Sequence, residues 1–416
     1  MSSIDITIKL YLAIFFVSGS IAFSQNQYGW RGADRSGIYN ESALLKVWPS
    51  AGPALLWETS EIGSGYSSAT VTEDAIYITG RKGSYDVLNA LTQDGKLKWE
   101  VTYGKSSDSN YPDTRGTPTI SNDLIFLVSG MGDLVCITKD GKIVWSVNYS
   151  LKYDGVTPDF GISESPLVVD NMVIVTPGGK KAAMVAFNVD NGKVIWETPS
   201  INDVTQYVNP LLVEYGGKRL IITLSADFIF AVDADNGKLQ WKFNYMAECP
   251  APDKRFAHIN TPVFRDGFLL VTSGYKKVGL KLKLKPDGAG PTVAWSNSDF
   301  DTLLGGTILL GDHLYGSNWE TNSFGKWVCV DWNTGKTEWI TDWYNRGSII
   351  AADGMIYIYE EKTGHVGLVK PGTVKLDVIS EFKISKGNGP HWAHPVINKG
   401  RLFVRHGDYL AVYKIK

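Results

Sequence analysis

Short apolar runs alternate with polar turns along almost the whole chain. Residues 220–224 and 229–232 form two such runs, and a shorter, more polar stretch separates them. Apolar runs of this length, bounded by turn residues, are typical of β-strands. The pattern therefore predicts an all-β protein built from strand, turn, strand units.

A seven-residue motif that ends in Trp gives the period of the fold. Clear copies occupy residues 93–99, 139–145, 190–196, 235–241 and 333–339, and each contains Gly-Lys. Degenerate copies end at Trp295 and Phe382, and the segment around Trp57 matches the strand half alone. The aromatic positions 57, 99, 145, 196, 241, 295, 339 and 382 are 42 to 54 residues apart. This spacing is typical of the blades of a β-propeller.

Turn residues and prolines predict four strands in each unit. Asp-Gly and Asp-Asn-Gly supply the positive φ that a tight hairpin needs, and the Trp then follows on the next strand. A further short strand precedes each unit and often opens with Pro, at positions 118, 166, 210, 262 and 395. Proline is tolerated there because no donor of the ladder is lost at the first residue of a strand.

The two ends of the chain predict how the ring closes. After Phe382 the sequence supplies strands around residues 395–397, 401–405 and 409–414 but no final Trp strand, and residues 54–59 supply that strand. We therefore expect an eight-bladed β-propeller of four-stranded blades. An N-terminal strand completes the last blade, which leaves no open sheet edge.

The N-terminus predicts secretion. Lys9 precedes an apolar run over 10–23 with a Ser-Gly-Ser interruption, and small residues stand at 22 and 24. We interpret residues 1–24 as a cleaved signal peptide, 25–50 as an arm and 51–416 as the propeller. An uncleaved anchor is the alternative. No later segment has 18 uninterrupted apolar residues, so we expect no membrane span and a secreted or periplasmic, monomeric protein.

Composition changes this picture little. The 416 residues include 41 Lys and Arg against 43 Asp and Glu, so the formal charge is −2. A balance this close to zero gives no electrostatic footprint for nucleic acid. Hydrophobic residues at 44% exclude a disordered tail protein.

The three cysteines lack an obvious disulfide. Cys136 and Cys329 occupy the position of the repeat that holds Ala90, Ala186 and Ala231 in other units. We expect both to be core residues, because a free Cys behaves as a small hydrophobe. Cys249 lies alone in a loop and is a candidate reactive thiol.

The repeat resembles the PQQ-like β-propeller family over about residues 51–416. Residues 231–241 and 329–339 are similar to the docking motif Ala-x-Asp-x-x-Thr-Gly-Lys-x-x-Trp of quinoprotein dehydrogenases, and residues 30–37 resemble the leader of secreted members. The resemblance implies that the motif tryptophans pack between adjacent blades. The docking tryptophans are then Trp57, Trp99, Trp145, Trp196, Trp241, Trp295 and Trp339.

The family includes PQQ-dependent alcohol and sugar dehydrogenases as well as binding propellers such as the outer-membrane protein assembly lipoprotein. The adjacent cysteines and the haem-attachment motif of the enzymes are absent from this sequence, and so is the lipidated Cys of the lipoprotein. We favour a scaffold that binds a protein or a small polar or saccharide ligand and requires no cofactor. The alternative is a quinoprotein dehydrogenase with PQQ and calcium, and a hydrolase or lyase is a third possibility.

Polar residues on the loops that enter the innermost strands are candidates for a ligand site at one mouth of the channel. Arg115 and Arg346 can fork onto a carboxylate or phosphate, and Trp392 can stack on a ring. A water-filled polar channel with Arg–Glu pairs is the structural alternative, and in a dehydrogenase Glu164 would be a metal ligand or base. The expected ligand-binding residues are Arg115, Glu164, Tyr207, His258, Asn260, Arg346, His391 and Trp392, with Tyr66, Asn209 and His394 nearby.

Other motifs carry less chemistry. Residues 233–237 match the repeated turn better than a calcium loop, and His391 with His394 lacks a third zinc ligand, so we expect no metal site. No catalytic residue can be named without spatial information. Five lysines form a basic strand pair that we expect to be exposed: Lys276, Lys277, Lys281, Lys283 and Lys285. The last three lie on one side of their strand and could bind an anionic partner.

Overall fold

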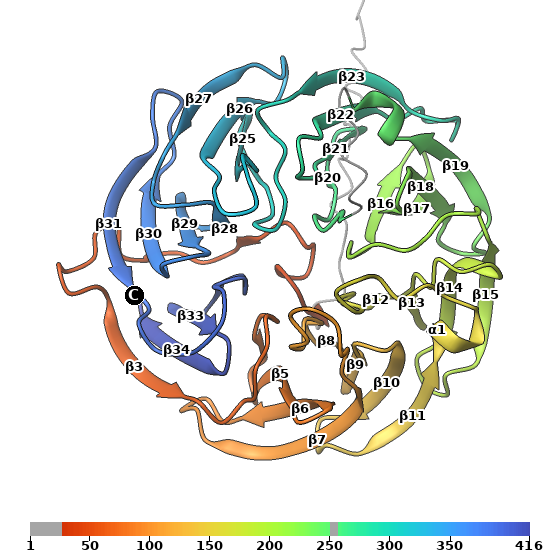
Figure 1. Cartoon of the computed structure of the whole chain (residues 1–416), viewed down its shortest axis with the longest axis horizontal. Helices are drawn as coiled ribbons and strands as arrows, with labels where there is room; N and C mark the ends of the chain where they lie inside the picture. The colour runs from red at the N-terminus through yellow and green to blue at the C-terminus, as the bar shows by residue number, and fades with distance from the viewer. Residues whose placement is uncertain (1–26, 250–256) are drawn as a thin grey trace, which may run out of the picture.

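The computed structural model describes residues 27–249 and 257–416, and almost all of its regular structure is strand. Eight blades stand side by side in a ring (Figure 1). The eight-bladed propeller expected from the repeat is therefore confirmed. The predicted signal peptide, 1–24, lies outside the described residues.

Each blade is an antiparallel sheet whose strands follow one another from the centre of the ring to its rim. The first four blades consist of β4 (Thr70–Val71), β5 (Ile76–Lys82), β6 (Tyr85–Leu91) and β7 (Leu97–Lys105); β8 (Thr119–Ser121), β9 (Leu124–Val128), β10 (Asp133–Thr138) and β11 (Ile143–Asn148); β12 (Leu167–Val169), β13 (Met172–Val175), β14 (Ala182–Asn188) and β15 (Val194–Pro199); β16 (Leu211–Tyr215), β17 (Lys218–Leu224), β18 (Phe228–Asp233) and β19 (Leu239–Asn244).

Two short helices follow the outer strands of the second and fourth blades in the described chain: α1 (Tyr149–Lys152) and the 3-10 turn η1 (Met246–Glu248). The next three blades repeat the order of the first four. None of the helices in the described ranges is long and apolar enough to cross a membrane. The strands of these blades are β20 (Val263–Arg265), β21 (Phe268–Val271), β22 (Gly279–Lys283) and β23 (Thr292–Asn297); β24 (Ile308–Leu310), β25 (His313–Ser317), β26 (Trp327–Asp331) and β27 (Thr337–Thr341); β28 (Gly347–Ala352), β29 (Met355–Glu360), β30 (His365–Lys370) and β31 (Asp377–Lys383).

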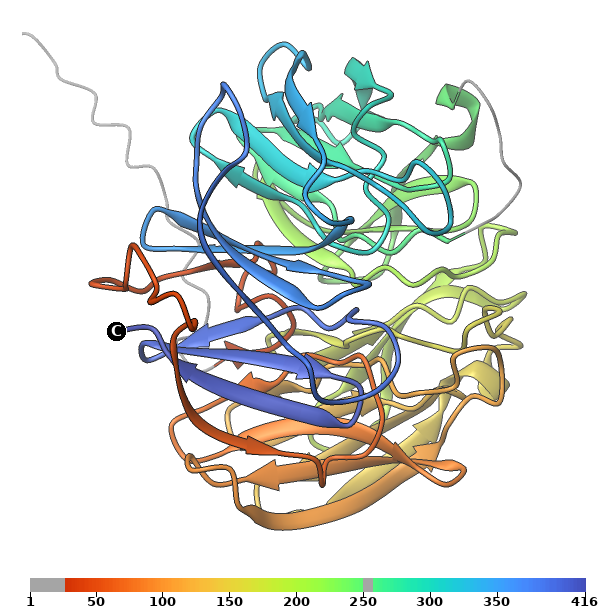
Figure 2. The same cartoon turned by 60° about the vertical axis from the view of Figure 1, so that its left-hand side comes forward.

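The eighth blade is built from both ends of the chain, as the sequence predicted. The N-terminal strand β3 (Ala54–Thr59) pairs antiparallel with the C-terminal strand β34 (Tyr409–Lys414). The inner strands β33 (Arg401–His406) and β32 (Val396–Asn398) complete the sheet. In Figure 2 the outer strand of this blade, drawn in orange-red, lies against the violet C-terminal strands.

The motif tryptophans contact the following blade in every blade except the seventh, whose outer strand has no Trp. The indole Nε1 of Trp57 donates a hydrogen bond to the carbonyl of Gln93 in the neighbouring turn, at 3.0 Å. Trp99, Trp145, Trp196, Trp295 and Trp339 make the same kind of bond to a backbone carbonyl of the following blade, at 2.8–3.1 Å. Trp241 packs in a cluster shared by its own blade and the next. The docking role that the resemblance implied is thus present in the structure.

A repeated β-bulge places Ala or Cys opposite five of the docking tryptophans. Cys136 pairs with Trp145 and Cys329 with Trp339, and the register shifts at the next residue in both sheets. Both thiols are buried, and burial raises the pKa of each to about 12. The prediction that they are core residues is confirmed.

Two expectations about other side chains are wrong. Cys249 is buried in the core cluster of its blade and burial raises its pKa, so it is not the exposed reactive thiol that its loop suggested. Lys281 occupies the slot opposite Trp295 that holds Ala or Cys in other blades. It is buried, its Nζ donates to the carbonyl of Trp332 at 2.7 Å, and Lys277 is buried as well. Lys283 and Lys285 remain exposed, so the basic face is smaller than expected.

The N-terminal arm runs through the centre of the ring before it reaches the rim (Figure 1). Its strand β1 (Gln27–Tyr28) pairs with β8, and β2 (Ile38–Tyr39) pairs in parallel with β28. Both are two-residue strands with no sequence signature, which explains why the sequence did not predict this path.

Two buried arginines fasten the arm to the inner ends of the blades. Arg35 donates to the carbonyls of Ser165, Pro166 and Pro210, at 2.8–3.0 Å, and so joins the third and fourth blades. Arg31 donates to the carbonyls of Thr307 and Ile349, both at 2.8 Å, in the sixth and seventh blades. The arm therefore ties together blades on opposite sides of the ring.

Candidate functional site

A cavity of about 440 Å³ lies at the end of the central channel where the innermost strands begin. This volume falls in the usual range of small-molecule sites, about 300–1,000 Å³. Tyr66, Arg115, Tyr207, Arg346 and Trp392 line it from the loops that precede β4, β8, β16, β28 and β32. The other lining residues are Trp30, Tyr111, Phe160, Ser163, Asn209, Ala257, Ile259, Tyr275, Leu303, Leu304, Trp319, Asn322 and His394.

Aromatic side chains form two walls of this cavity. On one side the ring of Trp392 lies 5.0 Å from that of Tyr66 and 4.9 Å from that of Tyr111, and Phe160 continues the wall to Tyr207. The ring planes in this wall are tilted by 41–58° to one another. The walls therefore enclose a curved cup and do not form a flat slot.

The second wall is the pair Tyr275 and Trp319, whose rings lie 5.2 Å apart and are tilted by 52°. These two residues come from the hairpins β21–β22 and β25–β26, in the fifth and sixth blades. Asp301 holds both hairpins: its two carboxylate oxygens accept the backbone N–H groups of Lys276, at 3.0 Å, and Trp319, at 2.9 Å. Asp301 is thus a positioning residue for this wall.

Two aromatic residues of the cavity wall have a left-handed backbone. Tyr111 and Tyr275 have φ of 56° and 63°, in the left-handed region that bulky residues rarely adopt. Such a conformation costs about 1–2 kcal/mol for a residue with a side chain. Residues kept in this region despite that cost cluster at functional sites.

Arg115 supports the Tyr111 loop and faces the cavity. Its terminal nitrogens donate to the carbonyls of Asp113, at 3.1 Å, and Tyr111, and its guanidinium lies 5.5 Å over the ring of Tyr66. Burial lowers the pKa of Arg115. The phenol of Tyr66 donates to the Asp113 carboxylate at 3.1 Å, so Asp113 is engaged with a neutral partner.

Arg346 also lines the cavity, but its guanidinium is directed at the protein. Nε donates to Glu361 at 2.7 Å, and the terminal nitrogens donate to the carbonyls of Thr321, at 2.6 Å, and Asn322, at 2.9 Å. The interaction partly matches the Arg–Glu pairs expected of a structural channel. Arg346 therefore shapes the loop that carries Asn322.

Four of the expected ligand-binding residues lie outside the cavity lining. Glu164 is buried, and its Oε2 accepts the backbone N–H of Thr176 at 3.0 Å. Burial raises the pKa of Glu164 to about 7. His258, Asn260 and His391 are also buried and hydrogen-bonded within the protein.

Burial disfavours the charged form of the histidines near the channel. The ring nitrogens of His258 lie 2.8 Å from Ser273 Oγ and 2.8 Å from the carbonyl of Ala226, and burial lowers its pKa to about 4. His394 does line the cavity, yet its Nδ1 accepts from Arg31 at 3.0 Å and burial lowers its pKa to about 3. Neither ring is poised to move a proton near neutral pH.

The cavity also contains residues that sequence reasoning missed. Tyr111 and Phe160 lie on inter-blade loops, whereas Tyr275, Trp319 and Asn322 lie on hairpins between the second and third strands of two blades. None of these residues stands at the repeat position just before an innermost strand. The hairpin between the second and third strands opens on the same face of a blade, so aligning those hairpins along the repeat would have found the aromatic residues.

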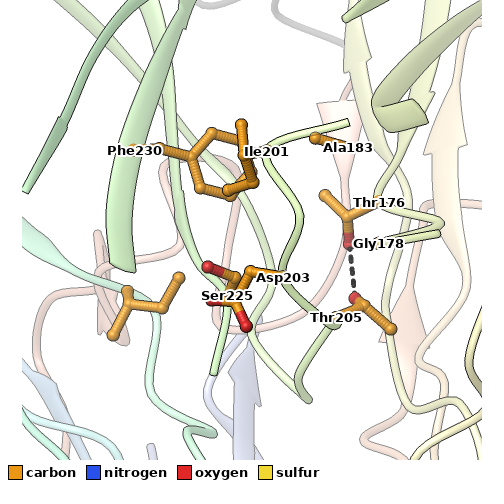
Figure 3. Close-up of a pocket in the computed structure, with 9 residues that line it drawn as sticks. Thr176, Gly178, Ala183, Ile201, Asp203, Thr205, Ser225 and Phe230 are labelled. Atoms are coloured by element: carbon orange, nitrogen blue, oxygen red, sulfur yellow. Dashed lines mark hydrogen bonds between the residues drawn. The ribbon is translucent and has the colours of Figure 1, made fainter. Parts of the chain in front are cut away.

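A second, much smaller cavity lies between the third and fourth blades. Figure 3 shows Thr176 and Thr205, whose hydroxyl oxygens are 3.3 Å apart, beside Ile201 and Phe230. Its volume of about 10 Å³ has room for a single water molecule. It is not a ligand site.

The sequence and the fold agree on the family. Residues 81–341 match the family model described as outer membrane protein assembly factor BamB. The chain belongs to this PQQ-like propeller family. No curated protein matches the chain in sequence.

Solved structures of the same fold have diverse functions. BamB from Moraxella catarrhalis is 13% identical with a TM-score of 0.64, and the match covers 87% of this chain and 99% of that one. A europium-containing methanol dehydrogenase is 13% identical with a TM-score of 0.63, covering 92% and 90%. Sqt1 from Saccharomyces cerevisiae is 11% identical with a TM-score of 0.61, covering 87% and 99%. At these identities the similarity establishes the fold, and the function must be argued from the site.

Proposed function

We propose that this propeller is a secreted or periplasmic binding protein that holds a saccharide in the cavity at the channel mouth. The observation that carries the proposal is the cup of eight aromatic side chains, interspersed with Asn209, Asn322 and Ser163. Aromatic faces offer apolar contact to the C–H groups of a sugar, and the polar side chains offer hydrogen bonds to its hydroxyls.

The tilt of the aromatic rings favours a puckered ligand. A flat ring system is bound best between two parallel faces, whereas the wall formed by Tyr66, Trp392 and Tyr111 turns by more than 50° at each contact. A saccharide ring presents faces and edges in several directions and fills such a cup. The left-handed backbone at Tyr111 and Tyr275 supports a binding role for both walls, because strain of this kind is retained where geometry matters.

The same residues fit a calcium-held quinone poorly. Calcium is bound by several oxygen ligands, usually with carboxylates among them. The cavity lining, as far as the chain is described, contains no Asp or Glu, and the described residues include no group of three or more His, Cys, Asp or Glu suited to a metal. Glu164, the candidate ligand, is buried outside the lining and bonded to Thr176. We therefore favour binding over quinone chemistry.

A calorimetric titration of the purified protein with a panel of mono- and disaccharides tests the proposal. We expect saturable binding by at least one sugar, and we expect Trp392→Ala to weaken it about tenfold or more. Trp343→Ala is the matched control, since Trp343 lies outside the cavity lining and is half-buried. If no sugar binds, or if the two variants behave alike, the proposal is wrong.

A further inference from the structure

The charges of the cavity lining are unbalanced. Its described part contains two arginines and no carboxylate. Arg346 is paired with Glu361 at 2.7 Å, which lies just behind the lining. Within the described chain, no carboxylate lies within 4.0 Å of the guanidinium of Arg115.

Arg115 is partly buried and has no ion-pair partner among the described residues. Its guanidinium donates to the carbonyls of Asp113 and Tyr111 and lies over the ring of Tyr66, which are all neutral groups. The carboxylates of Asp113 and Asp86 act on it only through space, since they accept hydrogen bonds from Tyr66 and Thr114. Two hydrogen bonds use two of the five N–H donors of a guanidinium, so donors remain for a ligand. A partly buried charge is normally paired, and an unpaired one at a cavity is a ready site for an anion.

Arg115 lies next to the ring most suited to stacking. Trp392 contacts both Tyr66 and Tyr111, and Arg115 lies over the first of these rings and holds the carbonyl of the second. A sugar ring on the face of Trp392 would therefore present its edge towards the guanidinium. A carboxylate on that edge can accept two parallel N–H bonds.

We propose that the ligand is an acidic saccharide whose carboxylate is bound by Arg115, with a uronate ring seated against Trp392. This inference rests on the proposed function and specifies its ligand class. The cavity, at about 440 Å³, has room for a ligand of one or two rings, which can be a free uronate or the end of an acidic chain.

Matched pairs of sugars test the inference. The protein is titrated with two pairs of sugars, in low and in high salt. The first pair is galacturonate and galactose, and the second is digalacturonate and the corresponding disaccharide of galactose. We expect the acidic member of each pair to bind about tenfold tighter or more, and high salt to reduce this preference. Preference for the disaccharide over the monosaccharide identifies the end of a chain as the source of the ligand, and equal binding identifies the free sugar.

Substitution of Arg115 separates charge from support of the loop. Arg115→Gln removes the charge and keeps a donor for the Tyr111 carbonyl, whereas Arg115→Lys keeps the charge. We expect Arg115→Gln to weaken the acidic sugar about tenfold or more and the neutral sugar less than about threefold, with Arg115→Lys in between. Equal binding of acidic and neutral sugars, or equal loss of both in Arg115→Gln, overturns the inference and leaves the proposed function intact. Absence of binding by any sugar overturns both.

Discussion

The indole of Trp57 lies against Gly95 of the neighbouring blade, and this contact joins the composite last blade to the first. A Cβ added at Gly95 would lie 2.4 Å from the Trp57 ring, and Gly95 has φ of +84°. The same relation recurs at Gly141 with Trp99, and at Gly192 with Trp145. The Gly of the motif is therefore required both by the turn and by the docking tryptophan.

Gly95→Ala should destabilise the ring at its point of closure. Gly83 is a matched control, because it also has positive φ (+62°) but nothing lies within 4 Å of an added Cβ. Both variants lose about 1 kcal/mol of unfolding free energy because Ala is placed in the left-handed region. Gly95→Ala should lose about 1–3 kcal/mol more, because its Cβ overlaps the ring of Trp57. The measurement is the urea midpoint of unfolding. Equal midpoints for the two variants would show that the docking contact is unimportant.

The arm should be essential to stability although the repeat does not include it. Arg35→Ala leaves three buried carbonyl oxygens without their donor, and we expect a loss of about 3 kcal/mol or more in the free energy of unfolding. Arg35→Lys should recover part of this loss, since an ammonium retains the charge but not the planar fork.

The control for this prediction is Lys46→Ala, on the same arm. Lys46 is exposed and its ion pair with Asp353 lies at the surface, so we expect a loss below about 1 kcal/mol. Chemical denaturation of the three variants measures the difference. An Arg35→Ala protein as stable as Lys46→Ala would mean that the arm is a passive appendage.

The stabilising contribution of the buried Glu164 carboxyl should fall as the pH rises from about 4.5 to about 7. Burial raises the pKa of Glu164 from 4.5 to about 7, so in this window the folded state binds more protons than the unfolded state. The contribution of this group to the unfolding free energy then decreases with pH by about 3 kcal/mol and levels off above about 7. Burial also raises the pKa of Asp301 to about 7, and that carboxyl contributes in the same direction. The rings of His258, His391 and His394 contribute in the opposite direction, because burial lowers the pKa of each.

Glu164→Gln should remove this contribution. The unfolding free energy at pH 8 minus that at pH 5 should therefore be about 3 kcal/mol more positive in the variant than in the wild type, while the parts due to Asp301 and the histidines remain. Glu61→Gln, at an exposed position, is the control and should leave the profile unchanged. The same pH difference in Glu164→Gln and in the wild type would contradict the assignment of a buried, protonated carboxyl.

Much of the fold could be predicted from the sequence because its stabilising contact is local and repeated. The turn Gly and the docking Trp recur in most blades, and Trp57 without its turn revealed the composite blade. Lys281 shows the limit of this reasoning. It lies opposite Trp295, at the position that holds Ala or Cys in five other blades, and its ammonium donates to the Trp332 carbonyl. The alternation of polar and apolar residues had predicted an exposed side chain there.

The site was harder to predict because repeat position fixes the loop but not the direction of a side chain. Arg115 and Trp392 line the cavity, whereas His258 turns inward and its ring bonds Ser273 and a backbone carbonyl. The arm is a second case: Trp30 reaches the cavity through a segment whose strands have two residues each. Whether a side chain points into the cavity or into the protein depends on which polar groups lack partners in the folded state.

The most direct test of the account is a crystal structure of the protein with a saturating saccharide, with galacturonate and galactose as the first ligands. We expect one sugar ring in the aromatic cup, in contact with Trp392 and within hydrogen-bond distance of Arg115. A cavity that stays free of sugar at a saturating concentration, or a sugar bound elsewhere on the propeller, would contradict the central claim that the channel mouth is the binding site.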